Sequence, residues 1–311
     1  MTAPVVSVIV VSDYGSGTAR LWSTERACFA ALTAQDFGEP AEFILCEDES
    51  YRGEVPSDLT DALAGSRVLF SSGATSYSLK NAGVRDASAP IVALLDADCR
   101  PDADWLRLLV QSFRSNPDIS VVSGRTFYEG AGVWERVLCL LTRSYLDPGR
   151  RGESAFASNN AGGFRKDVYL KHPLPENLGA FAARMQSESI RRSGGMLWFE
   201  PRMRVVHEFE GWPMEADIRR NIGYGTVVTR LADERMPYAS LVRAGVPSIP
   251  LIVAGKLLNT WRDCARCARA YGVRWHELPL ALAAAVAVQI MEVPGMIAAY
   301  RGRSIGASAY R

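Results

Sequence analysis

The sequence predicts an α/β fold built on a mostly parallel sheet, and three observations support this prediction. Short apolar runs alternate with segments of helical periodicity through the first 125 residues. The runs Val5–Val11 and Ile91–Leu95 are continuously apolar, as expected of strands buried on both faces. Several of these runs end in polar or acidic residues, and ligands bind at the carboxyl ends of strands in parallel sheets.

The predicted elements follow one another as strand–helix–strand units. Val5–Val11 is rich in β-branched residues, which favour strands. Pro101 interrupts the chain after the fourth strand, and Asp102 or Asp104 can cap the helix that begins near Trp105. The predicted strands cover 5–11, 42–46, 68–71, 91–95 and 119–123, and the predicted helices cover 21–35, 78–86 and 105–114.

Composition limits the class of protein. The 311 residues suffice for one large α/β domain and an appendage, and 48% hydrophobic content can build a core. The net charge of +1 gives no electrostatic basis for binding nucleic acid, so no such partner is expected. Six scattered cysteines, and a first segment without the features of a signal peptide, lead us to expect a reducing cytoplasmic compartment.

The strand end Asp96-Ala97-Asp98 is the strongest candidate site. Two carboxylates one residue apart can meet one divalent cation and a sugar hydroxyl, and their hard oxygens suit Mg²⁺ or Mn²⁺. The alternative is that the pair only caps a loop, because this pattern is common by chance. Two other predicted strands end in Ser12-Asp13 and Glu47-Asp48, and this convergence at one edge favours the functional interpretation.

Five segments occur in a specific order and spacing: 4–14 (PVVSVIVVSDY), 44–50 (ILCEDES), 78–106 (SLKNAGVRDASAPIVALLDADCRPDADWL), 158–171 (SNNAGGFRKDVYLK) and 194–208 (GGMLWFEPRMRVVHE). Together they resemble the catalytic domain of glycosyltransferase family 2, which has the GT-A fold, and the resemblance covers roughly residues 4–230. It implies a mostly parallel, Rossmann-like sheet flanked by helices.

On the donor side, the resemblance implies that Asp48 hydrogen-bonds the nucleotide base, in a pocket also lined by Val11, Asp13 and Tyr14. For Asp48, a turn-forming role is the alternative. The resemblance further implies that Asp96 and Asp98 bind the ribose and the metal ion on the diphosphate.

Three more residues are placed near the diphosphate or the metal by the resemblance: Lys80, Asn81 and His207. A lysine there would help neutralise the diphosphate. A solvated helix face is the alternative for Lys80 and Asn81, and a structural role is the alternative for His207.

On the acceptor side, small residues in the segment 158–165 would let a sugar approach the backbone, with Asn159 and Asn160 bonding its hydroxyls. A tight turn is the alternative. Residues 208–220 could close over the donor, and Arg219 would then assist departure of the nucleotide diphosphate.

The catalytic base departs from the family pattern. The family places a Glu-Asp pair about twelve residues before the Gly194 segment, and this chain has Ala182-Ala183 there. Glu188, in a predicted helix over 181–192, could substitute, although it could equally form a surface ion pair with neighbouring arginines. Otherwise another acid comes from the acceptor loop, or the enzyme is degenerate.

Beyond residue 236 the composition changes. We therefore expect a glycosyltransferase domain over 1–236, with a donor half (1–125) and an acceptor half (126–236), and a helical region over 237–311. The uncharged runs Val246–Gly255 and Leu278–Met291 are flanked by arginines and fall short of the about 18 residues of a confident membrane span. They predict an interfacial or re-entrant helical pair on the cytosolic membrane face, anchored by aromatic residues (Trp261, Tyr271, Trp275). An ordinary helical subdomain is the alternative.

Taken with the resemblance, these features predict an inverting, metal-dependent enzyme of polysaccharide or cell-envelope biosynthesis. It would pass a sugar from a nucleotide-diphosphate donor to a hydroxyl of a glycan or lipid-linked glycan. One alternative is a polyprenyl-phosphate sugar synthase, whose phosphate acceptor needs no strong base. Another is a GT-A domain that binds a nucleotide or a partner without catalysis.

Overall fold

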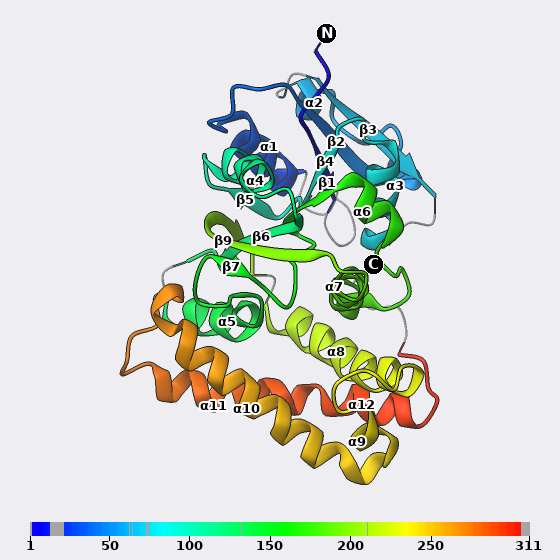
Figure 1. The fold of residues 1–311 in the computed structure, drawn as a ribbon, viewed down its shortest axis with the longest axis vertical. Coiled ribbons are helices and arrows are strands. Elements are labelled where there is room, and N and C mark those ends of the chain that lie inside the picture. The colour runs from blue at the N-terminus through cyan, green and yellow to red at the C-terminus, as the bar shows by residue number, and fades with distance from the viewer. Residues whose placement is uncertain are drawn as a thin grey trace.

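The computed structural model describes residues 2–12, 22–61, 63, 65–72, 75–130, 132–209 and 211–305. In this part of the chain, nine strands form one sheet in the order β3-β2-β1-β4-β8-β6-β9-β5, with β7 paired to β9 (Figure 1). The strands are β1 (Val6–Val11), β2 (Ala41–Asp48), β3 (Ser66–Ser71), β4 (Ile91–Asp96), β5 (Cys99–Pro101), β6 (Ile119–Tyr128), β7 (Gly152–Glu153), β8 (Ala161–Arg165) and β9 (Met196–His207).

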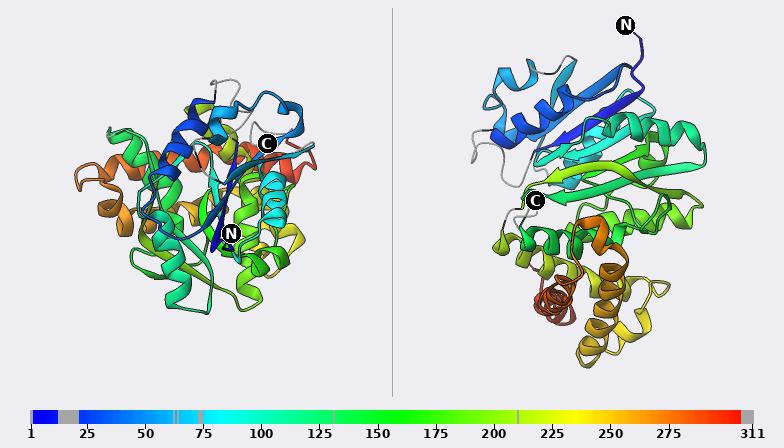
Figure 2. Two further views of the ribbon diagram at one scale, coloured as in Figure 1. Left: turned by 90° about the horizontal axis from the view of Figure 1, so that it is seen from above. Right: turned by 90° about the vertical axis from the view of Figure 1, so that its left-hand side faces the viewer.

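The helices cover both faces of this sheet and extend below it (Figures 1 and 2). They are α1 (Ser23–Thr33), α2 (Ser57–Asp61), α3 (Ser76–Asp86), α4 (Trp105–Ser115), α5 (Val133–Arg143), α6 (Lys166–Lys171), α7 (Ala182–Arg192), α8 (Trp212–Ala232), α9 (Ala239–Arg243), α10 (Ile249–Cys267), α11 (Leu278–Met291) and α12 (Val293–Tyr300).

The first four strands of the sheet order are parallel, as predicted. In register, Val6 of β1 lies opposite Ala41 on one side and Ile91 on the other. The carboxyl ends of β1, β2 and β4 therefore lie at the same edge. The other half is mixed: β8 is antiparallel to both β4 and β6, whereas β6 and β9 are parallel. The predicted α/β class is confirmed, and the short strand β5 is an addition to it.

The side chains of β1 alternate between two hydrophobic cores, one on each face of the sheet. Val8 and Val10 belong to the cluster that α1 and α4 cover, while Ile9 and Val11 belong to the cluster on the α3 side. A β-carbon at Gly83 of α3 would lie 2.4 Å from Ile9 Cγ2, so the helix can pack this closely only because residue 83 is glycine. Close packing of α3 brings Lys80, one turn earlier, toward the sheet edge.

The C-terminal helices form a layer that packs against α8 (Figure 1). At the crossing of α8 and α12, a β-carbon at Gly223 would lie 1.9 Å from the Glu292 carbonyl oxygen. A β-carbon at Gly295 would lie 1.9 Å from the Arg220 carbonyl oxygen. The two backbones are therefore in direct contact. The division into domains at residue 236 stays a prediction.

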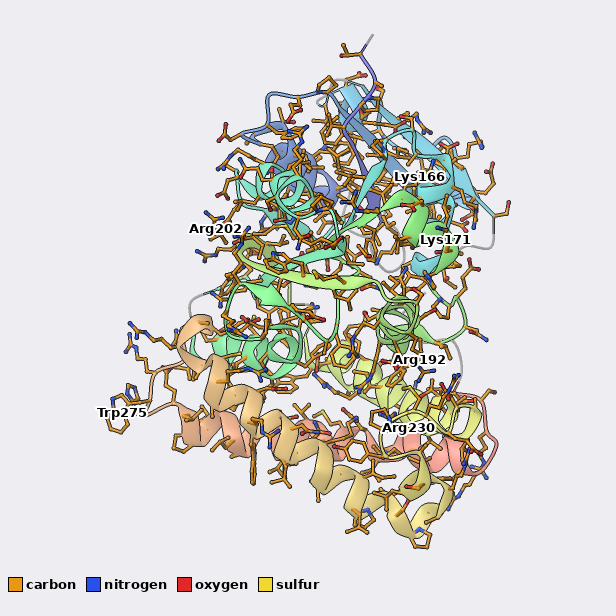
Figure 3. All side chains as sticks on the ribbon, in the orientation of Figure 1. Lys166, Lys171, Arg192, Arg202, Arg230 and Trp275 are labelled. Carbon is orange, nitrogen blue, oxygen red and sulfur yellow. The ribbon has the colours of Figure 1, made fainter. Side chains whose placement is uncertain are left out.

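The apolar stretch that begins at Leu278 is longer than the sequence analysis allowed. The helices α11 and α12 are separated only by Glu292, and together they give a stretch of 23 residues, Leu278–Tyr300, long and apolar enough by composition to cross a membrane. Two of the three predicted aromatic anchors pack inside the protein: Tyr271 is buried, and Trp261 Nε1 donates to the Leu282 carbonyl at 3.0 Å. Trp275 is 86% exposed and projects from the body of the molecule (Figure 3).

Candidate active site

The carboxyl edge of the parallel strands gathers the predicted donor-side residues. Val11 lies between Cys46 of β2 and Asp96 of β4 in register, and Asp48 is two residues beyond Cys46. The Ala97 amide donates to the Val11 carbonyl at 2.9 Å, which extends the pairing past the end of β4. The parallel pairing and register of these strands therefore bring their ends together, as predicted. Asp13 and Tyr14 lie outside the described residues.

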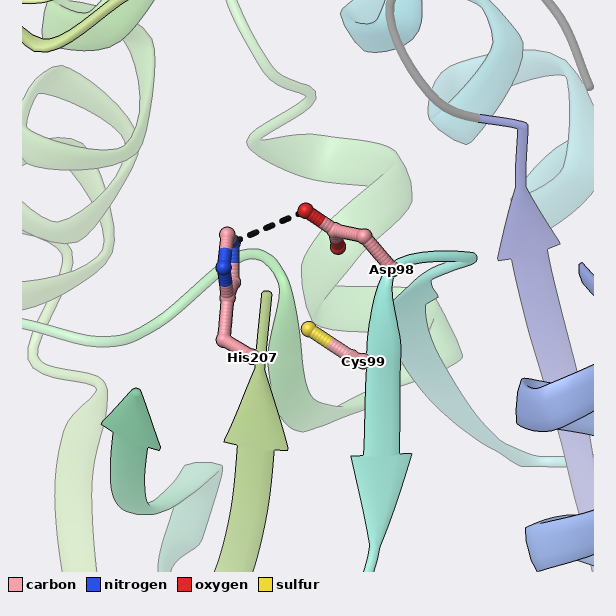
Figure 4. A group of neighbouring side chains, drawn as sticks. All are labelled: Asp98, Cys99 and His207. Atoms are coloured by element: carbon pink, nitrogen blue, oxygen red, sulfur yellow. Dashed lines mark ion pairs between the residues drawn. The ribbon is translucent and has the colours of Figure 1, made fainter. Parts of the chain in front are cut away.

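Asp98 and His207 meet at this edge because two strands pair there. In the antiparallel β5–β9 ladder, Cys99 lies opposite His207, and the Glu208 amide donates to the Asp98 carbonyl at 3.1 Å. His207 Nε2 consequently lies 3.2 Å from Asp98 Oδ2 (Figure 4). Both side chains are buried.

The chemistry of this pair fits a divalent cation. Burial and, to a smaller extent, the charge of Arg143 lower the pKa of His207 to about 3, so the ring is neutral. Its Nδ1 bonds the Glu208 carbonyl, which assigns the proton to Nδ1 and leaves the Nε2 lone pair facing the carboxylate. Two ligands about 2.1 Å from one ion and near a right angle lie about 3 Å apart, close to the observed separation.

Cys99 completes a group whose possible ligand atoms all lie within 4.8 Å of one another. Burial raises the pKa of its thiol well above the usual value, and the neighbouring aspartates raise it further. A neutral thiol is a poor ligand for a hard cation. The geometry therefore favours Asp98 and His207 over Cys99.

Asp96 has a different partner from Asp98. Its Oδ1 lies 2.6 Å from Lys80 Nζ, and the Lys80 side chain is only 3% exposed. The alternative of a solvated helix face is wrong for Lys80, since it is buried against the site. The capping box between Thr75 and Ser78 fixes the start of α3 and so positions this lysine.

Asn81 makes its contacts with the chain itself. Its Nδ2 donates to the Leu174 carbonyl and to Glu176 Oε1, both at 2.9 Å. Its Oδ1 accepts from the Tyr169 hydroxyl and the Leu174 amide. These four bonds use the full capacity of the amide group, so the structure gives Asn81 a role in holding the segment after α6.

Asp48 ends β2 and caps the turn that follows. Its Oδ1 accepts from the Ser50 amide at 2.9 Å and from the Ser50 hydroxyl at 2.6 Å, so the turn-forming role holds. Contact with a nucleotide base stays a prediction.

Sequence reasoning missed Glu25, a buried acid of α1 that accepts from Ser12 Oγ at 3.0 Å. The signal available in the sequence was the position of Glu25 on the same helix face as the buried Cys28.

On the acceptor side, the Asn160 carbonyl accepts from the Asp96 amide at 3.2 Å, so this segment borders the carboxylate edge. Asn160 is buried, and its Oδ1 accepts from Ser158 Oγ at 2.5 Å, whereas Asn159 is half-buried. Arg219 is buried and pairs with Glu215 at 2.5 Å and with Glu292 at 3.7 Å. Substrate contacts of all three stay predictions.

The position where the family has its acidic pair holds alanine in this chain, as the sequence analysis stated. Ala182 is fully buried and cannot accept a proton. Glu188 pairs with Arg192 at 2.8 Å and with Arg191 at 3.5 Å along α7. Its assignment as base stays a prediction.

A cavity of about 800 Å³ lies between β6, β9 and the turn over residues 268–272, and it reaches Tyr128, the register partner of His207. None of its lining residues comes from the ends of β1, β2 or β4. It does not serve as the predicted donor pocket.

The sequence matches the family model described as glycosyl transferase family 2 over residues 18–186. No curated protein is detectably similar to the chain.

Solved glycosyltransferase structures resemble the chain in three dimensions. The mannosyltransferase PcManGT from Pyrobaculum calidifontis, in complex with GDP-Man and Mn²⁺, has a TM-score of 0.61 at 14% identity, covering 98% of this chain and 89% of that one. Residues 1–349 of S. aureus TarS, in complex with UDP-GlcNAc, give 0.52 at 12% identity, covering 96% and 92%. GalNAc-T7 with UDP, GalNAc and Mn²⁺ gives 0.50 at 17% identity, covering 72% and 48%. At these identities the likeness shows a shared fold.

Proposed function

This chain belongs to glycosyl transferase family 2, and from that premise we propose that it transfers a sugar from a nucleotide-diphosphate donor to a hydroxyl of a glycan or lipid-linked glycan. The observation that carries the proposal is the Asp98–His207 pair at the edge where β1, β2 and β4 end. Open α/β sheets bind their ligands at this edge.

The role of each side chain in binding the nucleotide-sugar donor follows from its partners. Asp98 and His207 would hold Mg²⁺ or Mn²⁺, which when bound balances the charge that develops on the departing diphosphate. Lys80 adds a fixed positive charge beside Asp96, where the ribose or diphosphate would lie. Asp48 would receive the base, as the residue at the end of β2, which is separated from β4 by β1.

Transfer would invert the anomeric carbon, because the acceptor oxygen attacks from the face opposite the diphosphate. Asn159 and Asn160 border the donor edge and would bond acceptor hydroxyls. Glu188 would take the proton. Its carboxylate pairs with Arg191 and Arg192, and it would have to leave these partners to reach an acceptor hydroxyl.

A polyprenyl-phosphate sugar synthase is the second candidate, and one observation favours it. Ala182 is buried at the place of the family's acidic pair, so no carboxylate acts from there. A phosphate acceptor is already ionised at neutral pH and needs no base. The two candidates differ in whether a lipid phosphate alone suffices as acceptor.

The C-terminal layer would rest on an anionic membrane surface. Residues 237–311 carry nine lysines and arginines against three acidic residues, whereas residues 1–236 carry 26 against 31. The layer also exposes large apolar side chains on α10 and α11 (Leu251, Leu258, Leu280, Val286, Ile290). Apolar burial combined with attraction to anionic lipids is how interfacial helices bind. We therefore propose that the enzyme works at the cytosolic membrane face.

A donor panel tests the proposal. Thermal unfolding is measured with Mn²⁺ and each common nucleotide sugar, with the Asp98→Ala variant beside the wild type. We expect one nucleotide class to raise the melting temperature of the wild type and not of the variant. Transfer or hydrolysis of that sugar, lost in the variant, would exclude a non-catalytic domain. No stabilisation by any nucleotide sugar would contradict the proposal.

A further inference from the structure

The cavity of about 800 Å³ lies where the sheet meets α5 and the C-terminal layer (Figure 1). One wall comes from β6 and β9, and the other comes from the start of α5 and the turn over residues 268–272. Cavities of this size are typical of small-molecule and oligosaccharide sites. The metal pair and the donor contacts proposed above leave it without a role.

The strand wall is set by a close approach of β6 to β9. A β-carbon at Gly124 would lie 1.8 Å from the Met203 carbonyl oxygen, so the two backbones touch there, and the strand register shifts at the same place. After this shift, Arg125 lies opposite Arg204, and both line the cavity. Phe127 follows two residues later on the same face of β6.

Aromatic rings supply the apolar part of the lining. Phe127 and Tyr271, one from each wall, lie with ring centroids 5.5 Å apart and planes tilted by 44°. The Arg204 guanidinium lies 4.6 Å from the Phe127 centroid, so polar groups surround the apolar ring surface. This combination suits a sugar, whose ring has an apolar face and hydroxyl groups around its edge.

The charges of the lining argue against a phosphate or another strong anion. Five arginines line the cavity, and four of them already pair with carboxylates of the chain: Arg125 with Asp147 at 2.7 Å, Arg136 with Glu277 at 2.6 Å, Arg202 with Glu200 at 3.0 Å and Arg204 with Asp102 at 3.7 Å. Asp104 and Glu135 add negative charge to the lining. The cavity therefore favours a neutral ligand over an anionic one.

Three polar groups of the lining form no hydrogen bond or ion pair with the residues that the structure describes: the Tyr271 hydroxyl, the Glu135 carboxylate and the Arg269 guanidinium. Tyr271 is the most informative of them, because its side chain is only 3% exposed. Burial raises the pKa of its phenol well above the usual value, so the hydroxyl keeps its proton and can donate. A buried hydroxyl without a partner costs free energy, which a ligand would recover.

Tyr128 connects the cavity to the candidate metal pair. It lines the cavity, and it is the register partner of His207. The two rings lie with centroids 5.8 Å apart, and the next amide of the strand, that of Glu129, donates to the His207 carbonyl at 3.0 Å. A chain of sugars lying in the cavity would therefore have one end beside the metal pair.

We propose that this cavity binds the sugars of the acceptor glycan that precede the one receiving the new sugar. The inference rests on the proposed function and narrows its acceptor to a neutral oligosaccharide. Sugar hydroxyls both donate and accept hydrogen bonds, so they can satisfy the phenol, the carboxylate and the guanidinium together. One sugar ring would pack on Phe127.

The experiment measures oligosaccharide binding to the full chain by surface plasmon resonance, without donor or metal. The probes are cellohexaose, chitohexaose and mannohexaose with their monosaccharides, a hyaluronan hexasaccharide as the acidic glycan, and inorganic pyrophosphate as a competing anion. Tyr271→Phe keeps the ring beside Phe127 and removes only the hydroxyl. Tyr145→Phe is the matched control, because that side chain is 47% exposed and lies outside the cavity.

We expect a neutral hexasaccharide to bind more tightly than its monosaccharide. Tyr271→Phe should weaken this binding by about two- to tenfold, the range for one hydrogen bond, and Tyr145→Phe should not. Glu135→Ala should also weaken it, and thermal unfolding checks that all variants are folded. Binding of no neutral hexasaccharide, or binding unchanged in both cavity variants, would overturn the proposal. Preference for the acidic glycan, or displacement by pyrophosphate, would overturn the assignment to a neutral ligand.

Asp98→Ala separates this site from the donor site. It removes a proposed metal ligand but no residue of the cavity lining, so it should bind the hexasaccharide as the wild type does and lose stabilisation by nucleotide sugar. Hexasaccharide binding by a wild type that no nucleotide sugar stabilises would contradict glycosyl transfer but not the glycan site. In transfer assays, equal KM values for the hexasaccharide and its monosaccharide would overturn the assignment of the cavity to the acceptor.

Discussion

The carboxylate edge and the junction of α8, α10 and α12, where Arg219, Lys256 and Glu292 lie, balance charge in different ways. At the edge, each acid of the Asp96–Asp98 pair faces a nitrogen of the chain, Lys80 at 2.6 Å and His207 at 3.2 Å. At the junction, Arg219 and Lys256 share the buried carboxylate of Glu292. The first region is positioned by strand register and the second by helices that pack together. The comparison teaches that strand register can hold two possible metal ligands side by side, whereas the packed helices pair their charges with one another.

The largest effect is expected at the edge. Asp98→Ala removes the carboxylate that faces His207, so bound metal and transfer activity should fall by at least about 100-fold. Titration of Mn²⁺ by its electron paramagnetic resonance signal measures the metal directly, and product formation measures the activity. Cys99→Ser is the matched control, since its neutral thiol should not hold the ion. Unchanged Mn²⁺ affinity in Asp98→Ala would contradict the assignment of the edge.

The next effect tests whether the junction depends on its acids. Glu292→Gln leaves Arg219 and Lys256 without a shared carboxylate in a buried place, which should lower the free energy of unfolding by about 3 kcal/mol. Urea unfolding followed by tryptophan fluorescence measures this change. Glu234→Gln is the control, because that side chain is 77% exposed. If the two variants lose equal stability, the junction is not a buried charge network.

A smaller effect is expected for the lysine of the edge. Lys80→Met keeps the length of the buried side chain but removes its charge, so affinity for the nucleotide diphosphate should fall by about tenfold. Isothermal titration with the best donor measures it, and Lys171→Met, 71% exposed, is the control. An unchanged affinity would mean that Lys80 only neutralises Asp96.

The smallest effect is expected on the outer surface of the C-terminal layer. Leu258 is 62% exposed, so Leu258→Asp should leave stability nearly unchanged and weaken binding to anionic vesicles several-fold. Vesicle sedimentation measures the change. Leu170→Asp, at an exposed leucine of α6 outside this layer, is the control. Equal behaviour of the two variants would argue against this face as the membrane contact.

The sequence predicted the parts that local pattern controls. Continuous apolar runs located β1 and β4, and the polar residues that follow them identified the edge. The contacts of Asn81 with Leu174 and Glu176 span more than 90 residues and could not be read from a local pattern. Arg219 was predicted to face the donor, but its partner Glu292 comes from the far end of the chain. The packing of Phe181 against α8 depends on the absence of a side chain at Gly225, which periodicity does not encode.

The close approach of Gly223 to the Glu292 backbone and of Gly295 to the Arg220 backbone has a mechanical consequence. With backbone against backbone and no side chain between them, the two helices leave no room to slide or swing independently. The distance between the carboxylate edge and the surface that would touch lipid is then constant. The enzyme would work at a set height above the bilayer, and an acceptor has to bring its reactive oxygen up to that height.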